Sequence, residues 1–368
     1  MPRLASLLLL VASALAFSAC DSDDPADSAL AEAEANLGAW TWIDVEGSVC
    51  RDGSATGIGV RLQDGADDLV IYLEGGGACF NGVTCATNPS SFGETEFGGR
   101  MSQVGEAGLF STTSASNPVA DWNAVYVPYC TGDVHAGTFP NNNLLDATQN
   151  TSIGVQQFVG HLNVERALAL LAEGLDTPGQ VLLTGSSAGG LGTLINFDAV
   201  AQTFSSSDLA LVSDSGPLFF ADNVLSPPLM DQVIALYNVP PTIPGAPQLF
   251  ATDALPGVYD YYATTYPGAT FGLASYLGDD TFQAFYGFGQ APGDLITDEE
   301  YAAGLRDVRA QLGDAWGTYF AEGDGHTFLL TPDRYTGISA GVALDAWIGG
   351  VLSGSPTDVD PGSGAAAF

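Results

Sequence analysis

Residues 181–192 read VLLTGSSAGGLG, and the five residues 185–189 fit the G-x-S-x-G pattern of a nucleophile elbow. The apolar run Val181–Leu183 predicts a buried strand, and the small residues after Ser187 predict the start of a helix. Glycines beside the serine would remove the Cβ atoms that clash on so sharp a turn. Because the chain has 46 glycines, a plain glycine-rich turn is the alternative interpretation.

Other segments alternate between strand and helix patterns around this motif. Short apolar runs predict strands over Asp67–Leu73, Trp122–Val127, Leu209–Ser213 and Thr318–Ala321. Helical spacing predicts helices over Val155–Leu175 and Ile338–Val351. We therefore expect an α/β fold of the α/β-hydrolase kind, with a mostly parallel central sheet flanked by helices. The Pro- and Tyr-rich stretch 227–268 predicts a cap-like insertion over the sheet edge, or a loosely packed insertion.

The charge of the chain is strongly acidic. It has 43 Asp and Glu residues against 8 Arg and no Lys, which gives a formal net charge of −35. This charge excludes a general nucleic-acid binder, because phosphate contacts need a basic face. We expect a surface adapted to high salt, where screening weakens self-repulsion, although a GC-rich genome would bias the composition similarly.

The N-terminus has the pattern of an export signal over residues 1–20. Arg3 is followed by the apolar run Leu7–Phe17 and by small residues that end at Cys20. A cysteine at this position resembles a bacterial lipobox, so we expect Cys20 to carry a lipid anchor to the cell envelope, with free secretion as the alternative. Residues 21–37 predict an acidic flexible tether, 38–352 the catalytic domain and 353–368 a disordered tail.

The remaining four cysteines predict disulfides, because export leads to an oxidising compartment. Three pairings are possible. Cys79 and Cys85 are close enough in sequence to close their own loop, and Cys50 and Cys130 would then form the second bond. The three histidines lie far apart in the sequence, so we expect no metal and no other cofactor.

A serine nucleophile needs a histidine base, and in α/β hydrolases this base follows the serine along the chain. His135 and His161 precede Ser187, so His326 is the candidate. The acid that orients the base is harder to choose, because Asp214, Asp279, Asp280, Asp294 and Asp298 all lie between Ser187 and His326.

The oxyanion hole needs backbone N–H groups that converge on one point. The residue after the nucleophile, Ala188, is expected to supply one of them. The run EGGGACF at 74–80 follows a predicted strand, so Gly76 and Gly77 are the expected further donors. A tight turn braced by a disulfide would fit the same run.

Four segments together resemble the pectin acetylesterase/Notum family of carboxylesterases. They are YLEGGGACFN at 72–81, YVPYCTGDVHAG at 126–137, VLLTGSSAGG at 181–190 and VSDSG at 212–216. The resemblance implies an α/β-hydrolase fold, a Ser-Asp-His triad and no metal. It places the nucleophile on Ser187 and the base on His326. A D-x-x-Q pattern carries the acid to Asp280, with Asp279 as the neighbouring alternative.

The resemblance also implies the pairings Cys50–Cys130 and Cys79–Cys85. The expected activity is hydrolysis of an O-acyl ester, in the first place an O-acetyl ester, of a small molecule or carbohydrate through an acyl-enzyme. An extracellular polyester depolymerase or lipase is the second hypothesis, favoured if the cap builds an apolar pocket. A catalytically inactive surface binding protein is the third.

Overall fold

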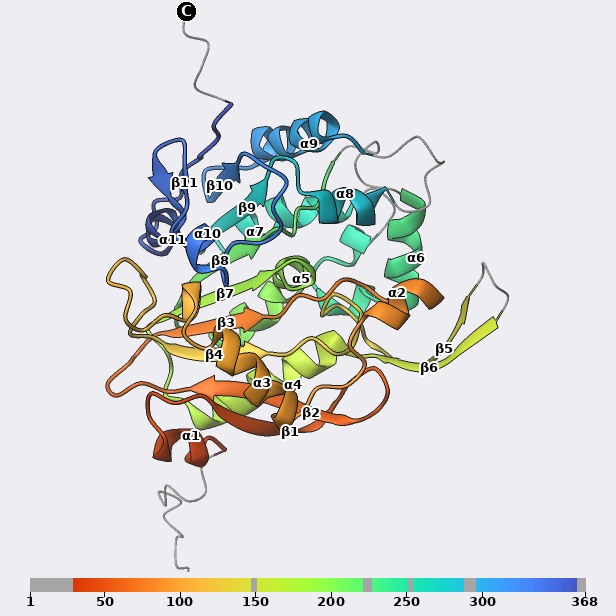
Figure 1. Cartoon of the computed structure of the whole chain (residues 1–368), viewed down its shortest axis with the longest axis horizontal. Helices are drawn as coiled ribbons and strands as arrows, with labels where there is room; N and C mark the ends of the chain where they lie inside the picture. The colour runs from red at the N-terminus through yellow and green to blue at the C-terminus, as the bar shows by residue number, and fades with distance from the viewer. Residues whose placement is uncertain (1–28, 147–150, 221–226, 251–253, 288–295, 363–368) are drawn as a thin grey trace, which may run out of the picture.

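The computed structural model describes residues 29–146, 151–220, 227–250, 254–287 and 296–362. Its centre is an eight-stranded sheet in the order β1-β2-β4-β3-β7-β8-β9-β10 (Figure 1). The strands are β1 Thr41–Val49, β2 Ala55–Arg61, β3 Leu69–Leu73, β4 Asn123–Val127, β7 Gln180–Ser186, β8 Asp208–Asp214, β9 Thr270–Tyr276 and β10 Trp316–Ala321. β1 and β2 pair antiparallel, and the neighbours from β4 to β10 pair parallel. The predicted mostly parallel sheet is confirmed.

Helices cover both faces of the sheet, so its central strands are apolar on both sides. Leu69, Ile71 and Leu73 of β3 point into one core cluster, whereas Val70 and Tyr72 point into the other. The first cluster is closed by α4 Gly160–Gly174, α5 Ala188–Thr203, α7 Val258–Thr265 and α9 Asp298–Gln311. The second is closed by α3 Glu94–Val104 and α11 Leu344–Leu352.

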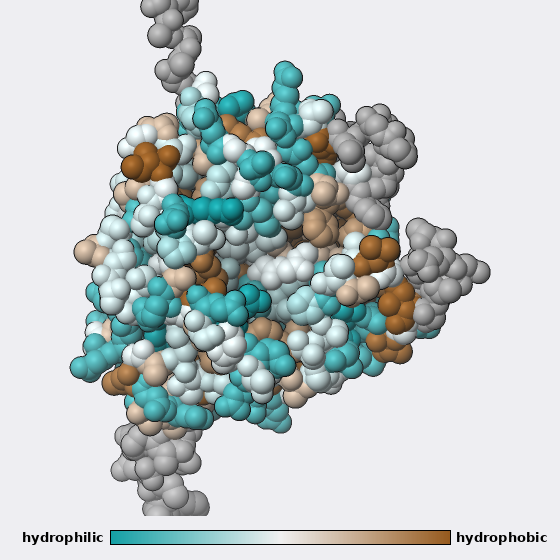
Figure 2. All heavy atoms as spheres, viewed as in Figure 1, coloured by the Kyte–Doolittle hydropathy of each residue, from teal (hydrophilic) through white to brown (hydrophobic). Residues whose placement is uncertain are grey.

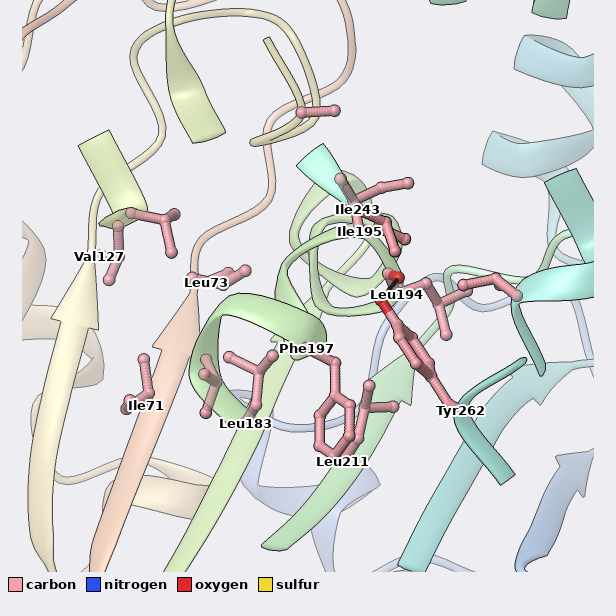
Figure 3. Close-up of a cluster of buried hydrophobic side chains, with 14 of the residues drawn as sticks. Ile71, Leu73, Val127, Leu183, Leu194, Ile195, Phe197, Leu211, Ile243 and Tyr262 are labelled. Carbon is pink, nitrogen blue, oxygen red and sulfur yellow. Dashed lines mark hydrogen bonds between the residues drawn. The ribbon is translucent and has the colours of Figure 1, made fainter. Parts of the chain in front are cut away.

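Helix α5 lies against the middle of the sheet and is buried along most of its length. Figure 3 shows Phe197 of this helix among Ile71, Leu183 and Leu211 from three neighbouring strands. The ring of Tyr262 from α7 packs edge-on against Phe197, with centroids 5.1 Å apart. Each such buried side chain contributes roughly 1.5–3 kcal/mol. The packing therefore fixes α5, and with it the residue at its N-terminus.

Two predicted helices begin later than expected. Residues 155–158 belong to β6 Thr151–Phe158, which pairs antiparallel with β5 Phe139–Asp146, so α4 starts at Gly160. Similarly, β11 Ile338–Ser339 and β12 Val342–Ala343 form a hairpin before α11. In both cases strand pairing takes residues that also fit a helical spacing.

The predicted cap lies between β8 and β9. It consists of α6 Pro227–Tyr237, the short 3-10 helices Pro240–Thr242, Pro247–Phe250 and Leu255–Gly257, and α7. Two short helices complete this side of the molecule, α2 Gly82–Thr87 after β3 and α8 Asp280–Tyr286 after β9. The β5–β6 hairpin extends away from the sheet beside α2 and α6 (Figure 1).

Both terminal segments are more ordered than the sequence predicted. Leu30 and Ala33, beside and within α1 Ala31–Ala35, are fully buried, so this part of the predicted tether packs against the domain, and residues 21–28 lie outside the described residues. Near the other end, Val359 bridges to Tyr319 of β10, and the buried carboxylate of Asp360 accepts hydrogen bonds from two arginines. The prediction of a disordered tail is wrong for residues 353–362. Cys20 and residues 363–368 lie outside the described residues.

Candidate active site

Ser187 occupies the turn between β7 and α5, with φ 60° and ψ −120°. A non-glycine residue with positive φ is strained and persists only where its surroundings fix it. The turn is tight because a Cβ on Gly189 would lie 2.0 Å from the carbonyl oxygen of Leu73, and one on Gly185 would lie 2.6 Å from that of Gly189. The strand–turn–helix geometry expected of a nucleophile elbow is therefore present.

His326 lies in the loop after β10, and its imidazole contacts a buried carboxylate. The Nδ1 atom is 3.0 and 2.9 Å from the two oxygens of Asp279, whose side chain is fully buried. Asp279 is also the N-cap of α8 and accepts a hydrogen bond from the N–H of Phe282 at 3.0 Å. These contacts hold the Asp279 carboxylate in one orientation toward the imidazole.

This geometry joins Asp279, and not the expected Asp280, to the imidazole by hydrogen bonds. Asp280 is the first residue of α8 and its side chain is exposed. The N-cap residue has non-helical backbone and turns its side chain toward the helix start, whereas the next residue projects from the helix. No hydrogen bond among the described residues joins Asp214, the other candidate, to the imidazole. Asp298, a further candidate, is the first residue of α9 and accepts a hydrogen bond from the Gln283 side chain at the surface. Asp294 lies outside the described residues.

The glycine run after β3 lies directly against the elbow. A Cβ on Gly75 would lie 2.4 Å from the carbonyl oxygen of Ser186 and 2.9 Å from the Cβ of Ser187. Gly77 has φ 79° and lines the same pocket as Ser187 and Ala188. Two of the expected donors, Gly77 and Ala188, thus line the pocket together with Ser187, and Gly76 lies between Gly75 and Gly77 in the run.

A buried polar cluster holds this glycine run, and sequence reasoning missed it. Tyr129 donates its hydroxyl to the carbonyl oxygen of Gly77 at 2.7 Å, and its N–H binds the Glu74 carboxylate at 3.0 Å. The same carboxylate forms an ion pair with Arg100 of α3 at 2.8 Å. Burial raises the pKa of Glu74, and the Arg100 charge opposes this shift. The signal in the sequence was Glu74 itself, because a glutamate directly after an apolar strand is buried only if another group pairs with its carboxylate.

His135 and His161, the two histidines that precede Ser187 in the sequence, form buried hydrogen bonds behind the glycine run. His135 is buried and its Nε2 lies 2.8 Å from the carbonyl oxygen of Glu74. His161 lies in α4 and binds the side chain of Asn196 through Nδ1 at 2.7 Å. The Asn196 amide in turn donates to the carbonyl oxygen of His135. These bonds connect the glycine run to α4 and α5.

An apolar pocket adjoins Ser187. Its walls come from the glycine run, α5, the cap and α8. The lining side chains include Phe80, Ile195, Leu229, Met230, Val233, Phe282 and Phe285. The ring of Phe282 is 5.7 Å from that of His326, so the imidazole lies at the margin of this pocket. Such a pocket fits an apolar group of several carbon atoms.

Part of the exposed hydrophobic surface lies on α2 and on the β5–β6 hairpin. Figure 2 shows hydrophobic side chains over α2 and the base of the β5–β6 hairpin. The exposed large apolar residues of these elements are Val83, Phe139 and Val155. No described helix has the length and hydrophobicity needed to cross a membrane.

Both expected disulfides are present. Cys79 and Cys85 join the glycine run to α2, with Cα atoms 4.2 Å apart. Cys50 and Cys130 join the turn after β1 to the segment after β4, with Cα atoms 5.0 Å apart. Arg51 links the two bonds, because its guanidinium donates to the carbonyl oxygen of Cys85 at 2.9 Å. Among the described residues, no His, Cys, Asp and Glu side chains gather as a metal site.

The sheet, the elbow and the His–Asp pair together define a protein of the α/β-hydrolase class. Residues 32–235 match the family model described as pectinacetylesterase. The chain belongs to the pectinacetylesterase family.

Curated relatives with related names also match part of the chain. The palmitoleoyl-protein carboxylesterase notum1a of Danio rerio is 32% identical over 183 residues, which are 47% of this chain and 34% of that protein. Pectin acetylesterase 4 of Arabidopsis thaliana is 30% identical over 190 residues, 50% of this chain and 44% of that protein. The matches therefore span less than half of these relatives.

The fold has a solved counterpart. A structure of the Wnt deacylase Notum from Drosophila superposes with a TM-score of 0.60 and 20% identity. It covers 87% of this chain and 95% of that one. Because 87% of the chain is covered, the shared architecture extends beyond residue 235, where the family model ends.

Proposed function

We propose that this protein is a carboxylic ester hydrolase in which Ser187 is the nucleophile, His326 the base and Asp279 the acid that orients the base. The observation that carries the proposal is the bond from His326 to the buried Asp279 in a fold whose β7–α5 turn holds Ser187 at φ 60°. The names of the relatives, carboxylesterase and acetylesterase, support the same reaction.

The reaction has two halves with balanced proton transfer. His326 takes the proton of the Ser187 hydroxyl through Nε2, while the serine oxygen attacks the ester carbonyl carbon. The tetrahedral intermediate collapses, the bond to the alcohol breaks, and the alcohol leaves with the proton from His326. Water, activated by the same imidazole, then attacks the acyl-enzyme and releases the carboxylic acid and Ser187.

The backbone around Ser187 supplies the charge stabilisation for this reaction. The N–H groups of Gly76, Gly77 and Ala188 are the proposed donors to the developing oxyanion. Gly75 touches the serine, and the Tyr129 hydroxyl fixes the carbonyl of Gly77. Donors that are already in place need no reorganisation when the charge develops, and removing one typically costs about 10²–10³-fold in kcat.

The pocket favours an acyl group longer than acetyl. The pocket beside Ser187 is lined almost entirely by apolar side chains, which offer contacts to an acyl chain longer than acetyl. Each methylene removed from water contributes about 0.8 kcal/mol, which corresponds to about fourfold in kcat/KM. This observation favours the lipase-like or polyester-cleaving alternative over the expected O-acetyl substrate. The name palmitoleoyl-protein carboxylesterase describes relatives that act on a long acyl group.

Export and anchoring form a separate part of the proposal. Residues 1–20 are proposed to direct export and Cys20 to carry a lipid anchor, with the catalytic domain outside the cell. The two disulfides fit an oxidising compartment. Metabolic labelling with a palmitate analogue would detect the anchor in wild type and not in Cys20→Ser.

The activity is tested with p-nitrophenyl esters from acetate to palmitate in high salt. We expect wild type to hydrolyse them, with kcat/KM rising beyond acetate. Ser187→Ala should lose activity, whereas the matched control Ser206→Ala, at an exposed position, should retain it. Folded wild-type protein that turns over none of the esters would disprove the enzymatic proposal and favour the binding-protein hypothesis.

A further inference from the structure

We propose that Asp214 is a positioning residue that joins the nucleophile turn to the histidine loop. This inference rests on the proposed function of Ser187 and His326. Asp214 is the last residue of β8 and is fully buried. One of its carboxylate oxygens, Oδ2, accepts hydrogen bonds from both halves of the site.

The first half is the nucleophile turn. The hydroxyl of Ser186, directly before Ser187, donates to Oδ2 of Asp214 at 2.7 Å. The backbone N–H of Ser187 donates to the carbonyl oxygen of Asp214 at 2.8 Å. The turn is therefore bound to Asp214 through one side-chain and one backbone contact.

The second half is the loop of His326. The N–H groups of Phe328 and Leu329 donate to the same Oδ2 atom at 2.9 and 3.0 Å. These residues come two and three positions after His326. A single oxygen atom thus receives three hydrogen bonds from two segments that are more than 130 residues apart in the sequence.

A second route through Ser215 reinforces the connection. The Ser215 hydroxyl donates to Oδ1 of Asp214 at 3.2 Å and accepts from the N–H of Thr327 at 3.2 Å. Ser187, Ser215 and Thr327 have φ values of 60°, 51° and 63°. Strained residues persist only where several contacts fix them, and these three surround one carboxylate. The cluster therefore fixes the nucleophile turn and the histidine loop to the same residue, Asp214.

The role differs from that of the triad acid. Asp279 binds Nδ1 of His326, whereas the described hydrogen bonds of Asp214 reach hydroxyl and backbone N–H groups. Asparagine can reproduce these contacts. Its amide oxygen would take the place of Oδ2, and its NH₂ group would face the Ser215 hydroxyl, which is also an acceptor. Alanine removes the carboxylate and with it the acceptor of four hydrogen bonds, three to Oδ2 and one to Oδ1.

The test compares Asp214→Ala, Asp214→Asn and Ser186→Ala, with Asp345→Ala as the matched control. Asp345 is a buried carboxylate that binds Ser116, and it lies on α11 outside the site. kcat and KM are measured with p-nitrophenyl butyrate, and near-ultraviolet circular dichroism checks the fold. A fluorophosphonate probe measures the reactivity of Ser187 independently.

For Asp214→Ala we expect kcat to fall about 100-fold with KM within twofold of wild type, because a misplacement of about 1 Å costs this much. Asp214→Asn should restore kcat to within about fivefold of wild type, and Asp345→Ala should keep it. Ser186→Ala should lower kcat about tenfold, and it decides the question if Asp214→Ala does not fold. Fluorophosphonate labelling should slow in the same order.

Unchanged kcat in a folded Asp214→Ala or in Ser186→Ala would overturn the proposal. An Asp214→Asn variant as inactive as Asp214→Ala would also overturn it, because the charge and not the contacts would then matter. Wild type that neither hydrolyses esters nor reacts with the probe would instead disprove the proposed function. The two failures are therefore distinguishable.

Discussion

The Nδ1 atom of His326 lies 3.0 and 2.9 Å from the two carboxylate oxygens of Asp279, and the residue that follows, Asp280, is exposed on α8. Two adjacent carboxylates thus have different surroundings. Only the buried one can fix the tautomer of the imidazole and stabilise its positive charge.

Replacing each carboxylate by an amide separates their roles. We expect Asp279→Asn to lower kcat by about 10⁴-fold, because the amide no longer favours the Nδ1–H tautomer. Asp280→Asn serves as the matched control and should keep kcat within about twofold, as an exposed substitution does. Steady-state kinetics with p-nitrophenyl butyrate measure both. Equal losses in the two variants would contradict the assignment.

The contact between the glycine run and the elbow predicts a second result. Gly75→Ala places a methyl group 2.4 Å from the carbonyl oxygen of Ser186, so the run must shift away from Ser187. We expect kcat to fall at least about 100-fold, as when an oxyanion donor is lost.

Gly98→Ala is the control for this substitution. Gly98 lies within α3, and a Cβ there meets no atom within 4 Å. We expect unchanged kcat and a gain of about 0.5–1 kcal/mol in the free energy of unfolding, because alanine restricts the unfolded chain. Full activity in Gly75→Ala would show that the run does not supply the donors.

The apolar pocket predicts a change in chain-length preference. Val233 of α6 lines the pocket, and Val233→Trp would fill part of it. We expect kcat/KM for the octanoate ester to fall at least about tenfold, equivalent to losing the burial of about two methylenes, with little change for acetate. Ala235→Trp, on the exposed side of the same helix, should leave both values unchanged. A parallel loss for all esters in Val233→Trp would contradict an acyl pocket.

The two disulfides should differ in their contribution to stability. Cys50–Cys130 closes a loop with a sequence separation of 80, and Cys79–Cys85 one of 6. Loop-closure entropy predicts about 4–5 kcal/mol for the longer loop and about 2 kcal/mol for the shorter one. Chemical denaturation of the double-alanine variant of each pair measures the difference. If removing the shorter bond costs more stability, its role in holding the glycine run outweighs the entropic term.

Two buried groups beside the site, Asp133 and His135, should have opposite effects on how the free energy of unfolding changes with pH. Burial lowers the pKa of His135 to about 4, below its ordinary value, so the unfolded state binds this proton first. Acidification through this range therefore removes stability. Burial raises the pKa of Asp133 to about 6, so here the folded state binds the proton first and acidification adds stability. The two contributions oppose each other, each by roughly 3 kcal/mol.

Asp133→Asn removes one side of this balance. Its amide can still bind the Thr131 hydroxyl and the N–H of Gly160, the present partners of Asp133. We expect the free energy of unfolding to fall more steeply than in wild type between pH 6 and pH 4, by up to roughly 3 kcal/mol. Denaturation curves at several pH values test this, with the exposed Asp64→Asn as control. Identical slopes in wild type and Asp133→Asn would show that Asp133 titrates normally.

Local sequence patterns by themselves predicted five of the eight strands of the central sheet (β3, β4, β7, β8 and β10), the turn at Ser187, the glycine run and the candidate base. These features depend on residues that are neighbours in the chain, so period, glycine spacing and chain order are sufficient to predict them. The disulfide pairs also followed, because one pair is close in sequence and the other is what remains.

Only the tertiary structure decided which carboxylate serves each role. Asp279 and Asp280 are adjacent residues of the same type, so the sequence does not distinguish them. Because α8 begins at Asp280, the side chain of the N-cap residue Asp279 is the one that turns toward His326. Asp214 joins two loops that are distant in the sequence, and the pocket is assembled from several separate segments between residues 77 and 286. The order of the terminal segments depends on distant partners as well, such as Asp360 with Arg306. Long-range packing and burial set these relationships, and no local pattern encodes them.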